Sequence, residues 1–294
     1  MDGSRPACAC ARAGTFGGMH DELKPLMDAA IEAALAAGRE ILAVYGTDFT
    51  TEQKADKSPL TEADKRAHQA IAAALLSTGL PVLSEEGKEV ELKERQGWQR
   101  YWLVDPLDGT KEFIKRNGEF TVNIALMERD EQPAGPLGSA RPIAGVLYAP
   151  VKDQLFFAWQ GGGAYRQHAA TSKGGSAYER ALSAERLPVP HALDAFTIVA
   201  SRSHQSPETE AYIARMEQEH GRVSLTSMGS ALKICLVAVG AADAYPRYAP
   251  TMEWDTAAGH AIANEAGRQL IDITTNEPMR YNKASLVNNW FIVQ

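Results

Sequence analysis

The spacing of apolar residues predicts two helices at the start of the chain. Leucine, isoleucine and alanine recur every three or four positions from residue 21 to 45, and Gly46 ends the pattern. Such spacing is typical of an amphipathic helix with one buried face. After a polar stretch, Thr61-Glu62-Ala63-Asp64 has the form of a capping box, and apolar residues repeat behind it as far as Leu75. We therefore expect a second helix that starts at Thr61.

From residue 80 the helical spacing gives way to short apolar runs and strict alternation. Phe120, Val122 and Ile124 alternate with other positions, and Gly161-Gly162-Gly163 indicates a turn. Helices followed by a mostly antiparallel sheet indicate an α+β domain. The expected strands cover residues 81–84, 100–104, 119–128, 143–149 and 154–159.

The stretch from residue 166 to 194 is polar and contains prolines, which favours a linker or an excursion. After residue 195, strands and helices alternate, as is typical of an α/β domain. The expected strands are 196–200, 223–226, 243–247, 268–273 and 290–293, and the expected helices are 207–220, 229–239 and 255–266.

A chain of 294 residues is long enough for two medium-sized domains. We expect a flexible extension over residues 1–18, an α+β metal-binding domain over residues 19–180 and an α/β domain over residues 181–294 that completes the metal and nucleotide site. A small-molecule site in such a protein usually lies at the domain junction.

Charge and cysteine content narrow the classes of function. The formal net charge of −7 argues against a nucleic-acid polymer as partner and against a general membrane-surface binder. Cys8, Cys10 and Cys235 suggest no disulfide framework and favour a reducing compartment. No apolar segment is long enough for a transmembrane span. We expect a cytoplasmic protein, at most peripherally attached to a membrane.

Two of the expected strands end in carboxylates. The run Trp102-Leu103-Val104 leads into Asp105-Pro106-Leu107-Asp108-Gly109-Thr110, and Val82-Leu83-Ser84 leads into Glu85-Glu86. Taken alone, Asp105 to Gly109 would be an ordinary turn more often than a metal site. However, consecutive strands usually neighbour one another, which would place the acids side by side. Burying carboxylates without a cation or several hydrogen bonds is costly.

A third acidic position, Asp255, stands at the start of an alanine-rich helix in Trp254-Asp255-Thr256-Ala257-Ala258. A plain N-cap is the structural alternative for it. An all-oxygen set of ligands suits Mg²⁺, or Mn²⁺ in its place, but not zinc. Two such ions about 4 Å apart would serve an in-line displacement at phosphorus. The oxygen donors that could share this site are Glu85, Asp105, the backbone carbonyl of Leu107, Asp108 and Asp255.

Thr110 directly follows Gly109, so its hydroxyl could hold an attacking water while the Gly109 and Thr110 amides meet a phosphate oxygen. That hydroxyl would need an acceptor to orient it. Asp64 could be this acceptor, but as the last residue of a capping box it has an equally good structural role. Spacing alone leaves both interpretations open.

Taken together, the motifs Asp105-Pro106-Leu107-Asp108-Gly109-Thr110 and Trp254-Asp255-Thr256-Ala257-Ala258 resemble the two signatures of the inositol monophosphatase superfamily of Mg²⁺-dependent, lithium-sensitive phosphatases. The continuation through Lys111-Glu112-Phe113 to Asn123 is similar to its 3'(2'),5'-bisphosphate nucleotidase branch, of the bacterial CysQ type. Inositol monophosphatases more often carry Asn-Phe in place of Glu112-Phe113. The similarity runs from about residue 20 to the C terminus. It includes Asp56-Lys57-Ser58-Pro59-Leu60-Thr61, Ser84-Glu85-Glu86, Ser201-Arg202-Ser203-His204, Gly229-Ser230-Ala231-Leu232-Lys233 and Tyr245-Pro246-Arg247.

This resemblance implies a layered αβαβα sandwich of the sugar-phosphatase type. It also implies metal ligation by the oxygen donors named above, with Asp64, Glu85 and Thr110 as catalytic residues. Asp64 and Thr110 would position the attacking water, and Glu86 would lie behind the ligands. The substrate contacts implied by the resemblance, besides Glu85, Leu107, Asp108 and Asp255, are Gly109, Thr110, His204, Ser230, Lys233 and Arg247.

Some of these contacts have structural alternatives of equal weight. Lys233 could belong to a solvated helix face, Arg247 could form a surface ion pair, and Lys111 could be a plain exposed charge. Two cations with polar neighbours would nevertheless suit the 5'-phosphate and ribose of a bisphosphorylated nucleotide.

The expected activity is hydrolysis of the 3'-phosphate of adenosine 3',5'-bisphosphate to AMP and phosphate, with 3'-phosphoadenylyl sulfate as a further substrate and a link to sulfur metabolism. The expected cofactor is two or more Mg²⁺ ions, with Mn²⁺ as a substitute and Li⁺ as an inhibitor. The alternatives are an inositol or sugar phosphate phosphatase and a non-catalytic, metal-dependent nucleotide-binding protein.

Overall fold

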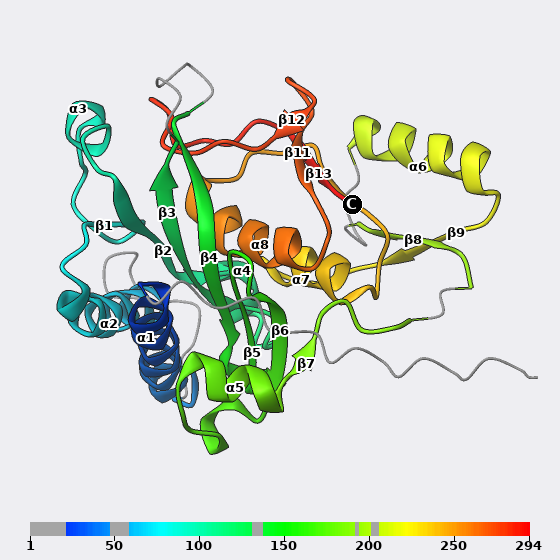
Figure 1. The fold of residues 1–294 in the computed structure, drawn as a ribbon. Coiled ribbons are helices and arrows are strands. Elements are labelled where there is room, and N and C mark those ends of the chain that lie inside the picture. The colour runs from blue at the N-terminus through cyan, green and yellow to red at the C-terminus, as the bar shows by residue number, and fades with distance from the viewer. Residues whose placement is uncertain (1–21, 48–58, 131–137, 192–193, 201–205) are drawn as a thin grey trace, which may run out of the picture.

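The structure is a computed structural model that describes residues 22–47, 59–130, 138–191, 194–200 and 206–294 (Figure 1). Within these ranges, none of the helices combines the length and the hydropathy of a membrane span. The predictions that lie outside the described residues concern the extension 1–18, Cys8, Cys10, Asp56-Lys57-Ser58 and Ser201-Arg202-Ser203-His204.

The helices occur in both halves of the chain. They are α1 (Leu23–Tyr45), α2 (Pro59–Leu75), α3 (Leu92–Arg95), α4 (Thr110–Ile114), α5 (Ala177–Ser183), α6 (Pro207–His220), α7 (Leu232–Val239) and α8 (Glu253–Glu265). Single 3₁₀ turns are η1 (Leu76–Thr78), η2 (Pro150–Lys152) and η3 (Ala170–Ser172).

The strands form one large and two smaller sheets. The first seven strands, in the order in which they follow one another in the chain and in the sheet, are β1 (Val82–Ser84), β2 (Arg100–Asp108), β3 (Thr121–Arg129), β4 (Ala140–Ala149), β5 (Gln154–Trp159), β6 (Gly163–His168) and β7 (Glu185–Arg186). The smaller sheets contain β8 (Phe196–Val199) and β9 (Val223–Thr226), and β10 (Tyr245–Arg247), β13 (Phe291–Val293), β11 (Leu270–Asp272) and β12 (Glu277–Pro278).

These elements stack as five layers (Figure 1). Helices α1 and α2 pack on one face of the seven-stranded sheet, and α8 lies across β3, β4 and β5 on the other face with α7 beside it. The small sheets follow, with β10 against α7 and β11 against α8, and α6 covers β8 and β9. The predicted layered αβαβα sandwich is therefore confirmed.

Apolar cores fill the spaces between these layers. One cluster lies between α1, α2 and the large sheet, where Met27, Ile41, Phe113 and Trp102 are fully buried or nearly so. On the opposite face, α8 approaches β4 very closely because residue 145 is glycine. A Cβ atom at Gly145 would lie 2.4 Å from the carbonyl oxygen of Ala258. The absence of this side chain sets the distance between the sheet and the helix.

The start of α2 differs from the prediction. The helix begins at Pro59, so Thr61 lies inside its first turn and is not the N-cap. Proline is favoured at the first helical position because its missing N–H has no partner there in any case. Asp64 is consequently not part of a capping box, which removes the structural role that the sequence had offered for it.

The predicted linker from residue 166 to 194 is wrong for much of its length. The segment contains the end of β6, η3, α5 and β7, and β7 pairs with β6 as the last strand of the large sheet. Its polar residues serve a buried network: the guanidinium of Arg180 donates to Gln167 Oε1 at 2.7 Å and to the Ala170 carbonyl at 3.1 Å. A polar sequence pattern does not distinguish such a network from a solvated loop. The proposed domain boundary near residue 180 stays a prediction.

Helix α7 begins three residues later than predicted. Residues Gly229 to Ala231 form a turn instead, in which Ser230 has a φ of 48°. This left-handed conformation is unusual for a residue other than glycine, asparagine or aspartate. The turn lies where the site residues meet.

Candidate active site

Strands β1 and β2 run parallel, so their carboxyl ends meet at one edge of the large sheet. Ser84 pairs with Val104. The next amide, that of Glu85, donates to the Val104 carbonyl at 3.1 Å. Glu85 and Asp105 are therefore neighbours, and their carboxyl groups are hydrogen-bonded. The prediction that these two strands bring their acids together is confirmed.

An irregularity in β2 turns Asp105 and Asp108 toward the same side of the sheet. Asp105 pairs with Asn123 on β3. Asp108 pairs with Thr121, so three steps along β2 match two steps along β3. Residues three apart in a regular strand face opposite sides, and one extra residue brings them back to the same side. The Leu107 amide fixes this bulge by donating to Asp105 Oδ1 at 3.0 Å.

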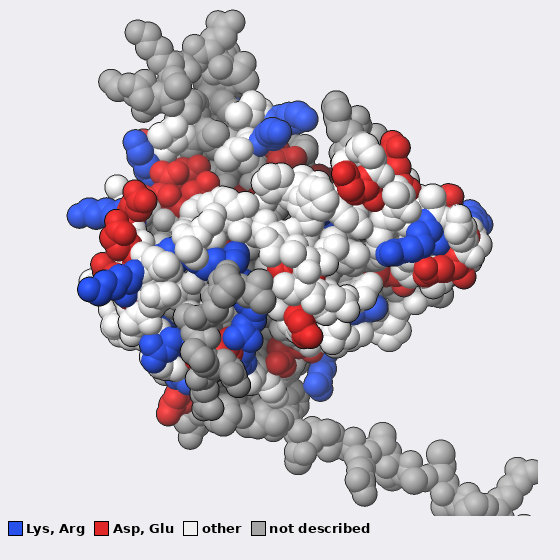
Figure 2. All heavy atoms as spheres, turned by 90° about the horizontal axis from the view of Figure 1, so that it is seen from above, with Lys and Arg blue, Asp and Glu red and all other residues white. Residues whose placement is uncertain are grey.

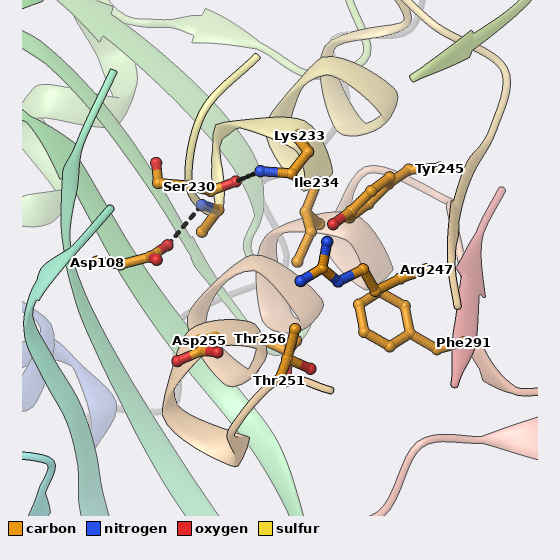
Figure 3. A pocket seen from close by; sticks show the side chains of 11 residues that line it. Asp108, Ser230, Lys233, Ile234, Tyr245, Arg247, Thr251, Asp255, Thr256 and Phe291 are labelled. Atoms are coloured by element: carbon orange, nitrogen blue, oxygen red, sulfur yellow. Dashed lines mark hydrogen bonds between the residues drawn. The ribbon is translucent and has the colours of Figure 1, made fainter. Parts of the chain in front are cut away.

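Asp108 is also held from the C-terminal half of the chain. The Ala231 amide donates to its Oδ2 at 2.6 Å, and the Asn123 side-chain amide donates to the same oxygen at 3.4 Å. Figure 3 shows the bond that joins Asp108 to the turn before α7. The strand acid and the α7 turn are therefore in direct contact.

Asp255 comes from the first turn of α8, which begins at Glu253 rather than at residue 255. Met252 is the N-cap residue, and its amide donates to Asp255 Oδ2 at 2.8 Å. The plain N-cap alternative for Asp255 is therefore wrong. Asp255 lines the hollow that Figure 3 shows.

Burial raises the pKa of the three acids at the ends of β1 and β2. Desolvation places the pKa of Asp105 well above its usual range, and the charges of Asp108 and Glu85 raise it further. The pKa of Asp108 is raised by desolvation, although the Lys233 ammonium and the Ala231 amide act against this. The pKa of Glu85 is also raised, first by desolvation, although its hydrogen bond to Asp105 opposes the shift.

The pKa values of Asp255 on α8 and Asp64 on α2 are raised as well. Desolvation and the charge of Asp108 raise the pKa of Asp255 to about 7. Desolvation, then Glu86 and Glu85, raise the pKa of Asp64 to about 8. Asp64 is buried, and its Oδ1 atom has no hydrogen-bond partner among the described residues.

The five acids, which we call the acidic cluster (Asp64, Glu85, Asp105, Asp108 and Asp255), fit a divalent cation. Their negative charges lie close enough to act on one another, and the buried Oδ1 atom of Asp64 has no hydrogen-bond partner in the described residues. Carboxylate oxygens are the ligands that Mg²⁺ prefers. Within the part of the chain that the structure describes, no three acidic, histidine or cysteine side chains already form a ready-made metal group. Mg²⁺ is usually held by one or two carboxylates with water and substrate phosphate rather than by an all-protein cage.

Thr110 is the first residue of α4 and is exposed. Gly109 precedes it with a φ of 99°, a conformation that few other residues adopt. Helix α4 packs against α2, which carries Asp64. A hydrogen bond between Thr110 and Asp64 stays a prediction.

A cleft of about 860 Å³ opens beside Asp108. Gly109, Thr110 and Lys111 line it, and so do Lys233 and Arg247. Both cations also line a smaller hollow with Asp108 and Asp255, shown in Figure 3.

The two cations are not committed to ion pairs in the described residues. The Lys233 ammonium donates to the Ser230 carbonyl at 2.8 Å, and Arg247 donates to the Pro250 carbonyl at 3.3 Å. The Arg247 Nε atom is buried and has no hydrogen-bond partner in the described part of the chain. A surface ion pair for Arg247 and a solvated helix face for Lys233 are therefore poor descriptions of these side chains.

Several residues at the site were missed from the sequence. Asn123 and Thr121 are fully buried polar residues in β3, and Thr121 donates to Asn123 Oδ1 at 2.9 Å. Their polarity in an apolar strand was the available signal. Glu119, Met228 and Tyr248 line the cleft as well, and nothing in their spacing indicated it.

Basic and acidic side chains are mixed on the outer surface. On the face in Figure 2, the Lys and Arg residues that are drawn in blue stand among Asp and Glu residues rather than forming a continuous basic stripe. This distribution and the net charge of −7 differ from the basic surface of nucleic-acid-binding proteins. The positive charge near the acidic cluster is local to the cleft.

Comparison with known proteins extends over nearly all of the chain. The model of the inositol monophosphatase family matches residues 22–292. The chain is 44% identical to the 3'(2'),5'-bisphosphate nucleotidase CysQ of Escherichia coli K12, over 91% of this chain and 99% of that protein. The crystal structure of CysQ from Bacteroides thetaiotaomicron aligns with a TM-score of 0.83 and 53% identity, covering 92% of this chain and 97% of that one. An inositol monophosphatase from Zymomonas mobilis, at 21% identity and a TM-score of 0.67 over 92% of each chain, shares the fold.

Proposed function

Because the chain belongs to the inositol monophosphatase family, we propose that it is a Mg²⁺-dependent phosphatase that removes the 3'-phosphate of adenosine 3',5'-bisphosphate, giving AMP and phosphate. The names of relatives that match almost end to end support this substrate. The observation that carries the proposal is the arrangement of the cleft, in which Asp108 and Asp255 of the acidic cluster line one hollow together with the cations Lys233 and Arg247.

The two parts of the cleft suit the two ends of such a substrate. The acidic cluster suits metal ions that meet the phosphate to be removed. Lys233 and Arg247 line the same cleft, and their charges would hold a second phosphate. A substrate with two phosphates can meet both the acids and the cations, whereas a monophosphate can meet only one of these groups.

The residues that would hold the metal ions are Glu85, Asp105, the Leu107 carbonyl, Asp108 and Asp255. Bound Mg²⁺ supplies positive charge that activates water and stabilises the oxygens of an in-line displacement at phosphorus. The protein supplies their positions: the β2 bulge aims two carboxylates at one side, and the Ala231 and Met252 amides fix Asp108 and Asp255.

Thr110 and Asp64 would orient the attacking water. The Thr110 hydroxyl accepts a hydrogen bond from the water and donates its own proton to Asp64, whose partnerless Oδ1 is ready to accept it. Gly109 allows the sharp entry into α4, and the N–H groups of Gly109 and Thr110 can then donate to phosphate oxygens. No covalent intermediate is needed.

The test is phosphate release from a small panel of esters, measured as kcat/KM. We expect adenosine 3',5'-bisphosphate to be preferred over inositol 1-phosphate and AMP, with 3'-phosphoadenylyl sulfate as a further substrate. We expect chelation of Mg²⁺ to stop turnover, Mn²⁺ to restore it and Li⁺ to inhibit it. A preference for inositol 1-phosphate would overturn the substrate, and turnover without any divalent cation would overturn the mechanism.

A further inference from the structure

Three backbone segments meet beside Asp108, and the sequence permits this only because two of the residues are glycines. A Cβ atom at Gly109 would lie 3.2 Å from Phe120 and from the Ser230 side chain. A Cβ atom at Gly229 would lie 2.6 Å from the Glu119 carbonyl oxygen and 2.5 Å from the Glu112 side chain. The metal-binding loop, the entry to β3 and the turn before α7 are therefore in van der Waals contact.

Hydrogen bonds fasten the turn of Gly229, Ser230 and Ala231 at both of its ends. At one end the Gly229 amide donates to Glu119 Oε2 at 2.9 Å. At the other end the Ala231 amide donates to Asp108 Oδ2 at 2.6 Å. The turn therefore spans the distance between a half-buried glutamate and an acid of the metal site, with one carboxylate at each end.

The middle of the turn faces the cleft. The Ser230 carbonyl accepts from the Lys233 ammonium at 2.8 Å, and the Ser230 hydroxyl lies 3.3 Å from Thr121 Oγ1. Ser230 adopts a φ of 48°, which costs free energy and persists only where neighbouring contacts enforce it. The hydrogen bonds of the Gly229 and Ala231 amides supply this constraint. They therefore fix the positions of Ser230 and Lys233.

We propose that Glu119 is a positioning residue, whose carboxylate holds the turn of Gly229 to Ala231 in place and thereby couples the substrate wall of the cleft to Asp108. This inference rests on the proposed function, because it assigns Asp108 to the metal and Lys233 to the substrate. Metal binding at Asp108 and substrate binding at Lys233 order the same turn. The metal should therefore raise the affinity for the substrate by the same factor as the substrate raises the affinity for the metal.

Two variants distinguish the effect of the Glu119 hydrogen bond from the effect of its charge. Glu119→Ala removes the acceptor, and we expect about a tenfold rise in KM for the bisphosphate and in the Mg²⁺ concentration for half-maximal rate, since hydrogen bonds to charged groups have about this value. Glu119→Gln keeps an acceptor oxygen for the Gly229 amide and should restore both quantities to within about threefold of the starting protein. Glu217→Ala, at an exposed position on α6, is the matched control for loss of a surface carboxylate.

A second measurement does not depend on turnover. Hydrogen exchange of peptides that cover residues 227–233 should be faster in Glu119→Ala than in the starting protein and in Glu119→Gln, while exchange of α8 stays the same. If Glu119→Ala does not fold, Gly229→Ala serves instead, because its added methyl group displaces the turn from Glu119. It should raise the same two kinetic quantities and speed the same exchange.

Two results would overturn the inference. One is unchanged exchange over residues 227–233 in Glu119→Ala, and the other is a Glu119→Gln protein as impaired as Glu119→Ala, which would mean that the charge acts directly. If instead the chain prefers another phosphate ester, the exchange experiment still decides the role of Glu119. Failure of the proposed function and failure of the positioning role are thus distinguishable.

Discussion

At the scale of single residues, the acidic cluster concentrates more negative charge than the surrounding protein balances. Asp108 is central because it touches strand β3 through Asn123 and the α7 turn through Ala231. Asp105 lies beneath it at 2% exposure. Such an arrangement is costly for folding alone, so it is best explained by what it binds.

Replacing Asp108 by asparagine should lower kcat/KM at least about 100-fold, which exceeds the usual effect of residues that only support metal ligands. The reason is loss of a charged ligand with little change in shape. The measurement is phosphate release at saturating Mg²⁺, together with calorimetric titration of Mg²⁺. Asp194→Asn, at an exposed position, is the control. A near-normal rate in Asp108→Asn would disprove the metal assignment.

Replacing Thr110 by alanine should lower kcat about 100-fold with KM little changed, because orientation of the attacking water matters only for the chemical step. Asp64→Asn should have the same pattern, since it acts on the same hydroxyl. The double variant should then be hardly worse than either single variant. Additive losses would mean that the two side chains act independently.

His260 offers a test of pH dependence away from the acidic cluster. Burial lowers its pKa to about 4, so below pH 6.5 the unfolded chain binds a proton that the folded protein does not. Stability from this group is complete above about pH 6.5 and is lost as pH falls toward 4, by about 3 kcal/mol in total. His260→Gln should remove this dependence in urea unfolding measured from pH 7 to 4. The same replacement at the exposed His191 is the control.

Glu85, Asp105 and Asp108 could be found from the sequence because they follow directly on apolar runs, and Asp255 because it lies in the first turn of a helix. The residues that hold these acids in position could not be found from the sequence. Glu119 acts on Gly229, 110 positions away in the chain, and Ala231 acts through its backbone amide, which every residue except proline has. Neither partner leaves a local pattern.

At the scale of elements, long and strongly periodic segments matched their predictions best. Helices α1 and α6 lie where the pattern placed them, because many residues contribute to each signal. The short strands β5 and β9 also match their predicted bounds. The short elements α4, α5 and β7 were not predicted from the sequence, since they depend on packing and buried polar contacts rather than on their own periodicity.

The start of α8 is anchored by a buried ion pair. Glu253 is fully buried and accepts from the Lys283 ammonium at 2.6 Å and from the Asn282 amide at 2.7 Å. Arg95 from α3 donates to the Asn282 side chain at 2.7 Å. These contacts fix the segment that presents Asp255.

Replacing Lys283 by methionine should destabilise the protein by about 3 kcal/mol, because it leaves the Glu253 charge buried without its partner. Adding Glu253→Gln should recover a large part of that loss, since the unpaired charge is then gone. Urea unfolding of the two variants and of the exposed control Lys93→Met gives these values. A double variant less stable than Lys283→Met would contradict this explanation.

At the scale of the whole molecule, the site draws on layers from both halves of the chain. Asp64 comes from the first helical layer, Glu85, Asp105 and Asp108 from the large sheet, and Asp255 from the middle helices. The order of layers was implied by the family resemblance rather than by the pattern of residues, because stacking depends on contacts between distant segments.

Because native but not unfolded protein joins these layers around the metal site, Mg²⁺ should stabilise the fold. At a concentration about 100 times its dissociation constant the gain is about 3 kcal/mol, or a rise in Tm of about 5 °C for a chain of this size. Scanning calorimetry with Mg²⁺, with chelator and with KCl at equal ionic strength measures it. The Asp108→Asn protein should show little of the rise. An equal Tm with Mg²⁺ and with chelator would argue against a metal site.

The glycine at position 145 has a consequence for how such an enzyme can diversify. Since α8 rests on β4 with no room for a methyl group, a side chain at position 145 would displace the helix that carries Asp255. The rim of the cleft, in contrast, includes residues outside the helices and strands, such as Met228 and Tyr248. New substrates are therefore more readily acquired through changes at the rim, while the phosphate chemistry beneath stays the same.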